Sequence, residues 1–206
     1  MKSSDKERII RRYDERLEKF GATIEALASG NIERHNLRFK ISTEVGIQNG
    51  DTILDLGCGF ADYYQYLAEQ GFNITYSGYD INPSLIEKAI EKFPQLDLQT
   101  KDILQDDFPT FDYIVSSSCF NLPLTEQDNY EFIAEILQKC YEHAEKGVAI
   151  DFNSSYVDFK SADGFHYEPE RVFSIAKKIT KRVSLRHDYP LFEFAIYMYK
   201  DFKGWR

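Results

Sequence analysis

The stretch Thr52-Ile53-Leu54-Asp55-Leu56-Gly57-Cys58-Gly59-Phe60-Ala61 decides how this chain folds. It begins with a short run of β-branched and apolar residues, breaks into Gly-x-Gly, and leads into a segment of helical apolar periodicity. This order is typical of a buried strand, a tight glycine turn and a helix. Because Gly57 and Gly59 carry no Cβ, the turn lets the backbone come close to a ligand.

A second strand ends in an acid at a spacing that suits nucleoside binding. The run Tyr76-Ser77-Gly78-Tyr79-Asp80 follows the first helix, and Asp80 lies 23 positions after Gly57 (80 minus 57). An acid about 20 residues after such glycines, at the tip of the next strand, can accept both ribose hydroxyls. The dinucleotide fingerprint needs another glycine or alanine after two more residues. That position is Asp62, so the dinucleotide pattern fails.

The rest of the chain alternates between the periods of strands and helices. Apolar residues at helical spacing predict two amphipathic helices before the first strand, over 4–20 and from near 31 to 45, with breaks at Gly21 and 28–30. We expect further strands near 73–79, 96–99, 111–117 and 147–152, with helices near 60–70, 84–93, 126–144 and 169–179. This alternation favours an α/β, doubly wound, mostly parallel sheet.

The last two predicted strands, 182–186 and 192–199, are joined by so short a link that they must run antiparallel. The link itself, His187-Asp188-Tyr189-Pro190-Leu191, is more polar than a simple hairpin turn requires. A long polar and aromatic loop, 153–168, precedes this hairpin. Long ordered loops are often functional.

Four segments together resemble the class I S-adenosylmethionine-dependent methyltransferases. Ile53 to Gly59 resembles the first motif of the family, Tyr79-Asp80-Ile81-Asn82 the second, Lys101-Asp102-Ile103 the third, and Phe111 to Val115 the fourth strand. The motifs occur in the family's order and cover residues 50 to 155. One departure is Ala61, where many members carry a third glycine.

The resemblance implies a seven-stranded Rossmann-like sheet whose seventh strand is inserted between the fifth and sixth. It also implies one domain over 1–206, with a core at 50–206. The helices at 1–46 would be a lid over the active site or a structural cap on the sheet, and the sequence leaves both open. Ligands bind beyond the carboxyl ends of parallel strands, so the turn at 187–191 is expected on the active-site side.

The same resemblance implies S-adenosylmethionine as cofactor. Asp55 and the glycine turn would lie along the methionine portion, Asp80 would take the ribose, and Asp102 would bond the adenine amino group. Ser117 or Ser118 would close the site at the tip of the fourth strand. Arg38 would pair with the methionine carboxylate, or else with Glu33 or Glu44 as a surface ion pair. The expected cofactor residues are Asp55, Gly57, Cys58, Gly59, Asp80, Ile81, Asp102, Ile103, Ser117, Ser118 and Arg38.

For the acceptor site the sequence suggests the polar turn of the hairpin. His187 would take a proton from the acceptor or orient it, Asp188 would fix the imidazole, and Arg186 would neutralise an acidic group on the substrate. The alternative is a structural turn whose polar side chains cap backbone groups. Cys58 is expected to pack as a small residue, since a reactive thiol needs an electropositive neighbour.

Composition limits the partners. A net charge of −9 argues against a nucleic-acid substrate. There is no long apolar run, and the polar segment 1–6 is not expected to be a secretory signal. Three cysteines without paired spacing are expected to be reduced thiols in a cytoplasmic protein. Metal binding is not expected, because Phe152 separates Asp151 from Asn153 where metal-dependent relatives carry Asp-Asn. Asn121-Leu122-Pro123-Leu124 lacks the aromatic of amino methyltransferases.

The favoured interpretation is therefore a methyltransferase that acts on a small-molecule acceptor, as a monomer or homodimer. A non-catalytic cofactor-binding protein and a nicotinamide-dependent oxidoreductase are the alternatives. The atom methylated does not follow from the sequence.

Overall fold

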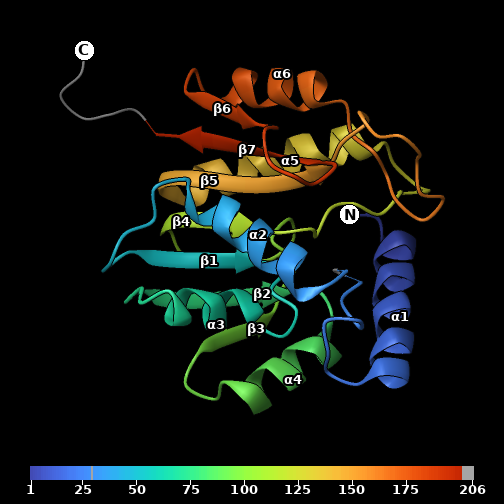
Figure 1. The fold of residues 1–206 in the computed structure, drawn as a ribbon, viewed down its shortest axis with the longest axis vertical. Helices are drawn as coiled ribbons and strands as arrows, with labels where there is room; N and C mark the ends of the chain where they lie inside the picture. The colour runs from blue at the N-terminus through green and yellow to red at the C-terminus, as the bar shows by residue number, and fades with distance from the viewer. Residues whose placement is uncertain (29, 201–206) are drawn as a thin grey trace.

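The structure, a computed structural model, describes residues 1–28 and 30–200. Its centre is a seven-stranded sheet in the order β3-β2-β1-β4-β5-β7-β6 (Figure 1). Ser29, which belongs to the predicted break at 28–30, and residues 201–206 of the predicted domain lie outside the described residues.

Strands β1 to β5 are parallel, and β7 runs antiparallel to both of its neighbours, β5 and β6. The predicted α/β fold with an antiparallel C-terminal hairpin is thereby confirmed. The strands are β1 (Thr52–Leu56), β2 (Thr75–Asp80), β3 (Asp97–Thr100), β4 (Phe111–Ser116), β5 (Ala144–Asn153), β6 (Val183–Arg186) and β7 (Glu193–Tyr199). Strand β5 begins earlier than predicted, because Ala144 already pairs with Phe111 where the preceding helix ends.

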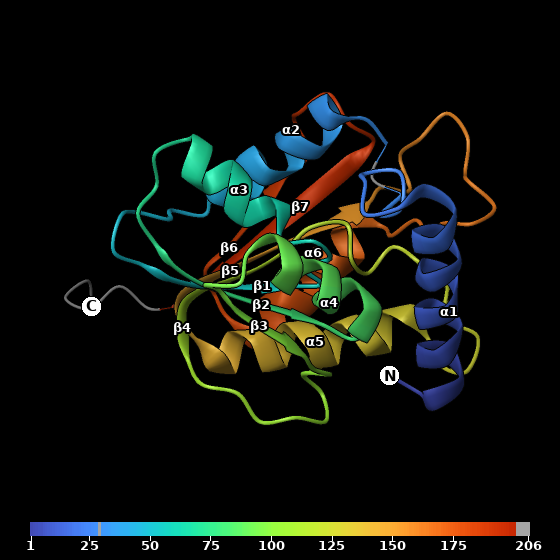
Figure 2. The same ribbon diagram turned by 90° about the horizontal axis from the view of Figure 1, so that it is seen from below.

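Helices cover both faces of this sheet (Figure 2). Neighbouring strand residues point to opposite faces, so Leu54 packs with α5 and α6, and Ile53 packs with α2, α3 and α4. The helices are α1 (Ser3–Phe20), α2 (Ile32–Thr43), α3 (Asp62–Glu69), α4 (Pro83–Lys92), α5 (Asn129–His143) and α6 (Pro169–Ile179). Both faces of the sheet are therefore buried, as a doubly wound fold requires.

Helix α1 belongs to neither layer. It stands across the carboxyl ends of the strands, beside the right-hand edge of the sheet in Figure 1. Its first turn is tied to the loop after β4, where the buried Asp5 carboxylate accepts hydrogen bonds from the backbone N–H groups of Thr125 and Glu126. Further along, the Asn82 side chain donates to the Ile10 carbonyl and to Asp14. The helix therefore bridges the tips of β2 and β4.

Candidate cofactor site

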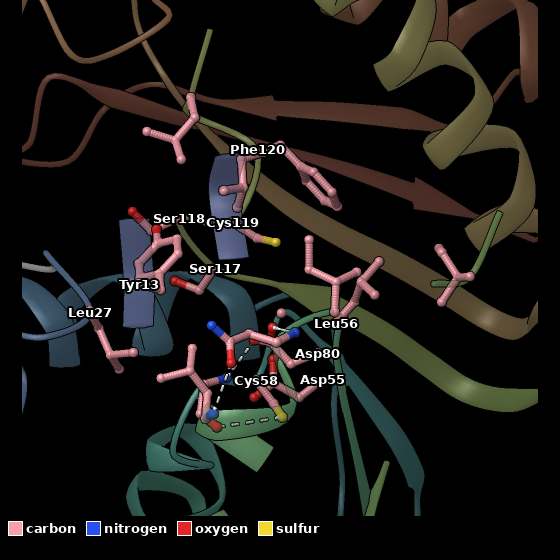
Figure 3. A pocket seen from close by; sticks show the side chains of 18 of the residues that line it. Tyr13, Leu27, Asp55, Leu56, Cys58, Asp80, Ser117, Ser118, Cys119 and Phe120 are labelled. Atoms are coloured by element: carbon pink, nitrogen blue, oxygen red, sulfur yellow. Dashed lines mark hydrogen bonds between the residues drawn. The ribbon is translucent and has the colours of Figure 1, made fainter. Parts of the chain in front are cut away.

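A cavity lies at the carboxyl ends of the central strands, between the glycine turn and α1 (Figure 3). Ser117, Ser118 and Cys119 stand on one side of it, and Cys58, Asp55 and Asp80 on the other. Ten of the eleven predicted cofactor residues line it: Asp55, Gly57, Cys58, Gly59, Asp80, Ile81, Asp102, Ile103, Ser117 and Ser118. Strand tips that are far apart in the sequence therefore converge on one space.

The glycine turn forms the floor of this cavity. Gly57 and Gly59 have φ angles of +75° and +53°, a backbone conformation that residues other than glycine rarely adopt. A Cβ on Gly57 would lie 2.3 Å from the Cys119 sulfur. The Gly57 N–H donates to the Tyr79 carbonyl at 2.7 Å, which ties the turn to β2. These contacts explain why glycine is needed and keep the backbone open towards the cavity.

Asp80 is held at the end of β2 by two backbone donors. One carboxylate oxygen accepts from the Gly59 N–H at 3.1 Å and the other from the Asn82 N–H at 2.9 Å. Burial raises the pKa of Asp80, and the backbone donors, including that of Ile81, oppose this rise. The carboxylate is therefore fixed in place next to the cavity, where its remaining lone pairs could accept hydrogen bonds from the two hydroxyls of a ribose.

Asp55 is the second buried acid of the floor. It is 4% exposed and accepts a hydrogen bond of 2.6 Å from the Tyr76 hydroxyl. Burial raises the pKa of Asp55 to about 7; the Tyr76 hydrogen bond opposes the rise, and Asp80 and Asp62 add to it. Such a carboxyl favours a cationic neighbour, because a positive charge would stabilise its ionised form.

The adenine end of the predicted site lies at the tip of β3. Ile103 is 2% exposed, and Asp102 accepts from the Leu104 N–H at 3.2 Å. The other Asp102 oxygen lies 3.2 Å from the Lys6 ammonium of α1. An apolar side chain next to an acid with an accessible edge suits a flat ring that carries an amino group.

Arg38 does not line the cavity. It donates to both carboxylate oxygens of Glu193, at 2.7 and 2.6 Å, and both side chains are buried. The proposed pairing with the cofactor carboxylate is therefore not supported, and the alternative partners Glu33 and Glu44 are wrong as well. Sequence spacing missed the true partner, because Glu193 lies 155 positions away and only the fold brings it to α2.

The polar turn of the hairpin also lies outside the cavity lining. Asp188 accepts a hydrogen bond of 2.7 Å from Arg186, where the sequence had suggested His187 as its partner. Arg186 forms a second ion pair with Glu44, the residue at the C-cap of α2. The His187 ring packs near Tyr156 and Phe194, with centroids 6.0 and 5.9 Å apart. These ion pairs hold the turn in place through side-chain partners, and not through the backbone caps that the sequence had suggested as the structural alternative.

Several cavity residues carried no sequence signal of their own. Tyr13 and Ile9 from α1, Lys101 after β3 and His35 from α2 line the cavity. His35 is 7% exposed, and its Nε2 lies 3.5 Å from an Asp62 oxygen. Each of these side chains sits in an amphipathic or loop segment whose pattern is explained equally well by packing, so only the three-dimensional arrangement identifies them.

Comparisons with known proteins point to one family. Residues 53–147 match the profile of a family described as "Methyltransferase domain". The chain is 32% identical over 158 residues to the Mycobacterium tuberculosis protein named "Putative methyltransferase Rv1506c". This alignment covers 72% of this chain and 93% of that protein.

Solved structures share the fold. The magnesium protoporphyrin IX methyltransferase of Synechocystis with bound S-adenosylhomocysteine has a TM-score of 0.65 and 12% identity, over 93% of this chain and 94% of the other. A TehB-like S-adenosylmethionine-dependent methyltransferase of Corynebacterium glutamicum has a TM-score of 0.59 and 20% identity, over 94% and 100%.

The chain belongs to the class I S-adenosylmethionine-dependent methyltransferase family. Its cofactor is S-adenosylmethionine, as the motifs implied. Among residues 1–28 and 30–200, no group of three or more His, Cys, Asp or Glu side chains is arranged to hold a metal ion. None of the helices described here combines the length and the apolar character that a membrane crossing requires.

Proposed function

We propose that this methyltransferase acts on a small-molecule acceptor and releases S-adenosylhomocysteine. The observation that carries the proposal is the position of α1, which stands across the carboxyl ends of the strands and contributes Ile9 and Tyr13 to the lining of the cavity. Met1, just before the helix, also lines it. A covered cavity with apolar walls admits a compact group and excludes a folded protein or a duplex. The net charge of −9 also disfavours nucleic acid.

The residues of the cavity suit the two ends of the cofactor. Asp80 would accept from the ribose hydroxyls, and Asp102 and Ile103 would hold the adenine. Asp55 and the glycine turn would lie along the methionine portion, with His35 replacing Arg38 as the side chain near its charged end. The cofactor supplies an activated methyl group, so the protein's task is to align the acceptor and exclude water.

The cofactor site is tested by Asp80→Ala. Loss of the charge-assisted hydrogen bonds to the ribose, worth about 1.5–3 kcal/mol each, should weaken S-adenosylhomocysteine binding at least tenfold in calorimetry. Asp80→Asn retains one oxygen, which can accept from either the Gly59 or the Asn82 N–H, and should give an intermediate affinity. Glu91→Ala, an exposed acid on α4, serves as the matched control. Equal affinities for Asp80→Ala and the control would remove Asp80 from the site.

The acceptor class is tested with methyl-labelled cofactor. We expect label in a library of small metabolites and none in added protein, RNA or DNA. Label that enters only the macromolecules would refute a small-molecule acceptor, whereas cofactor binding without any labelled product would make the chain a non-catalytic binder.

A further inference from the structure

A buried polar group lies directly behind one wall of the cavity. Ser117 follows β4 and lines the cavity, and its hydroxyl donates to a carboxylate oxygen of Asp151 at 2.9 Å. The other Asp151 oxygen accepts from the Ser118 N–H at 2.6 Å. Asp151, from β5, is 3% exposed and does not itself line the cavity. Ser117 therefore connects the cavity with a buried acid.

The backbone is bent to make this contact. Ser118 has a φ angle of +59°, a conformation that residues other than glycine rarely adopt. Strained residues of this kind persist where the surrounding structure holds them, and they gather at functional sites. Here the bend turns the Ser118 N–H towards Asp151 while the Ser117 hydroxyl still reaches both the acid and the cavity.

Asp151 has charged neighbours of both signs. Glu193 of β7 stands close to it, but Arg38 of α2 is bound to both oxygens of Glu193. The Tyr189 phenol from the hairpin turn and the Cys119 thiol complete the surroundings, and burial raises the pKa of both. Arg38 is thus shared between two acids, and one negative charge remains in excess when both acids are ionised.

The order of the strands places Ser117 on the acceptor side of the cofactor. This step rests on the proposed function. The adenine, ribose and methionine portions would lie at the tips of β3, β2 and β1 in turn, and β4 is the next strand in the sheet. Ser117, at the tip of β4, faces the cavity beyond the methionine portion, where a nucleophile would approach the sulfonium methyl group.

We propose that Ser117 and Asp151 form the proton-accepting wall of the acceptor site, so that the atom methylated here is an oxygen or nitrogen that carries a proton. The acceptor's lone pair forms the new bond to the methyl carbon while the bond between that carbon and sulfur breaks. The electron pair of the broken bond stays on sulfur, which becomes a neutral thioether. The acceptor's proton passes to the Ser117 oxygen as the Ser117 proton moves to the Asp151 carboxylate. Ser117 contacts the acceptor, and Asp151 acts through it.

The electrostatics of Asp151 suit this role. Burial, followed by the Glu193 carboxylate, raises the pKa of Asp151 to about 7, while Arg38 and the two serine donors oppose the rise. A base that titrates near the working pH is close to the optimum for general base catalysis.

Sinefungin provides a test that needs no identified acceptor. This cofactor analogue carries a primary ammonium in place of the methylsulfonium, and it otherwise meets the same groups as S-adenosylhomocysteine. Both affinities are measured by calorimetry from pH 5.5 to 8.5, and their ratio isolates what the protein offers at the methyl position. The variants are Asp151→Asn, Ser117→Ala and, as matched control, Asp112→Asn, which alters an acid of β4 that pairs with Lys146 away from the cavity.

In the wild type and in Asp112→Asn, the preference for sinefungin should rise about tenfold as Asp151 ionises through pH 7. The rise should vanish in Asp151→Asn and shrink in Ser117→Ala. A ratio independent of pH in the wild type, or a rise that survives both variants, would overturn the proposal while leaving the cofactor site intact. Failure of the wild type to bind S-adenosylhomocysteine would instead overturn the assigned site and this proposal with it.

Discussion

The two N-terminal helices are attached to the molecule in different ways. Of the residues in α1, all of them described, only Asp5 is buried. Helix α2 buries five side chains, including Phe39 and Ile41 in the core. Hydrogen bonds and ion pairs hold α1 to loops at the strand tips, and its partly buried Tyr13 and Leu17 pack against a small apolar cluster around Phe60. By contrast, fully buried apolar side chains and a buried ion pair hold α2 to β7.

This difference separates two roles that the sequence left open. Apolar burial is coupled to folding of the whole core, so α2 is expected to unfold only with the domain. Polar contacts at loop tips can break locally, so α1 can open while the sheet stays intact. We therefore interpret α2 as a structural cap on the sheet and α1 as the lid of the cavity.

The largest effect is expected where α2 meets the sheet. Arg38→Ala leaves the buried Glu193 carboxylate without its bidentate partner and should cost about 3–5 kcal/mol of unfolding free energy. Urea titration measures this, with Lys88→Ala, whose ammonium pairs with Glu91 on the exposed face of α4, as control at below about 1 kcal/mol. The double change Arg38→Met and Glu193→Leu should recover much of the loss. A cost near that of the control would make α2 as loosely attached as α1.

A smaller effect is expected for α1. Asp5→Ala removes the acceptor of the Thr125 and Glu126 N–H groups and should cost about 1–3 kcal/mol. Hydrogen exchange should show the loss as faster exchange in α1, with β1 and β4 unchanged, and S-adenosylhomocysteine should dissociate faster. Glu7→Ala, an exposed acid on the same helix, is the control. If Asp5→Ala unfolds the whole domain instead, α1 is a structural element and the lid interpretation is wrong.

Short sequence patterns predicted much of the fold, because the residues that define a strand, a helix or a turn lie close together in the sequence. The Gly57 turn has a backbone conformation that favours glycine, and the acid at the end of β2 is held by backbone N–H groups close to it in the fold. Strand order followed from the resemblance, and the short link at 187–191 required an antiparallel hairpin. These features position ten of the eleven predicted cofactor residues around one cavity.

Side-chain partners could not be predicted in the same way. Arg38 and Glu193 lie on α2 and β7, which meet only in the folded sheet. In the sequence, each of them looks like an ordinary charged surface residue. The turn at 187–191 looked catalytic because it is rich in polar groups, yet Arg186 and Asp188 satisfy each other and Glu44. Ser117 was predicted from its place at the tip of β4, but its buried partner Asp151 became visible only when β4 and β5 were aligned.

An intermediate effect, confined to binding, is expected from pH. The raised pKa of Asp55, about 7, means that the carboxyl is largely neutral below pH 7 and ionised above it. The methionine ammonium favours the ionised form, so affinity for S-adenosylhomocysteine should rise about tenfold between pH 6 and pH 8. Asp55→Asn should flatten this dependence in calorimetry, while hydrogen exchange in α1 and α2 stays as in the wild type. A wild-type affinity that falls over this range would exclude Asp55 as a partner of the ammonium.

The smallest effect concerns Lys6, the neighbour of Asp5 in α1. Its ammonium pairs with Asp102 at 3.2 Å, but its side chain is 33% exposed, so water already screens the pair. Lys6→Ala should therefore change the unfolding free energy by less than about 1 kcal/mol, with no change in hydrogen exchange along α1. Because the variant frees an Asp102 oxygen for the adenine amino group, S-adenosylhomocysteine should bind as well as in the wild type or slightly better, and added salt should reduce the difference. A loss of affinity as large as that of Asp5→Ala would show that Lys6 closes the lid as much as Asp5 does, and that the exposed side of α1 takes part in holding it down.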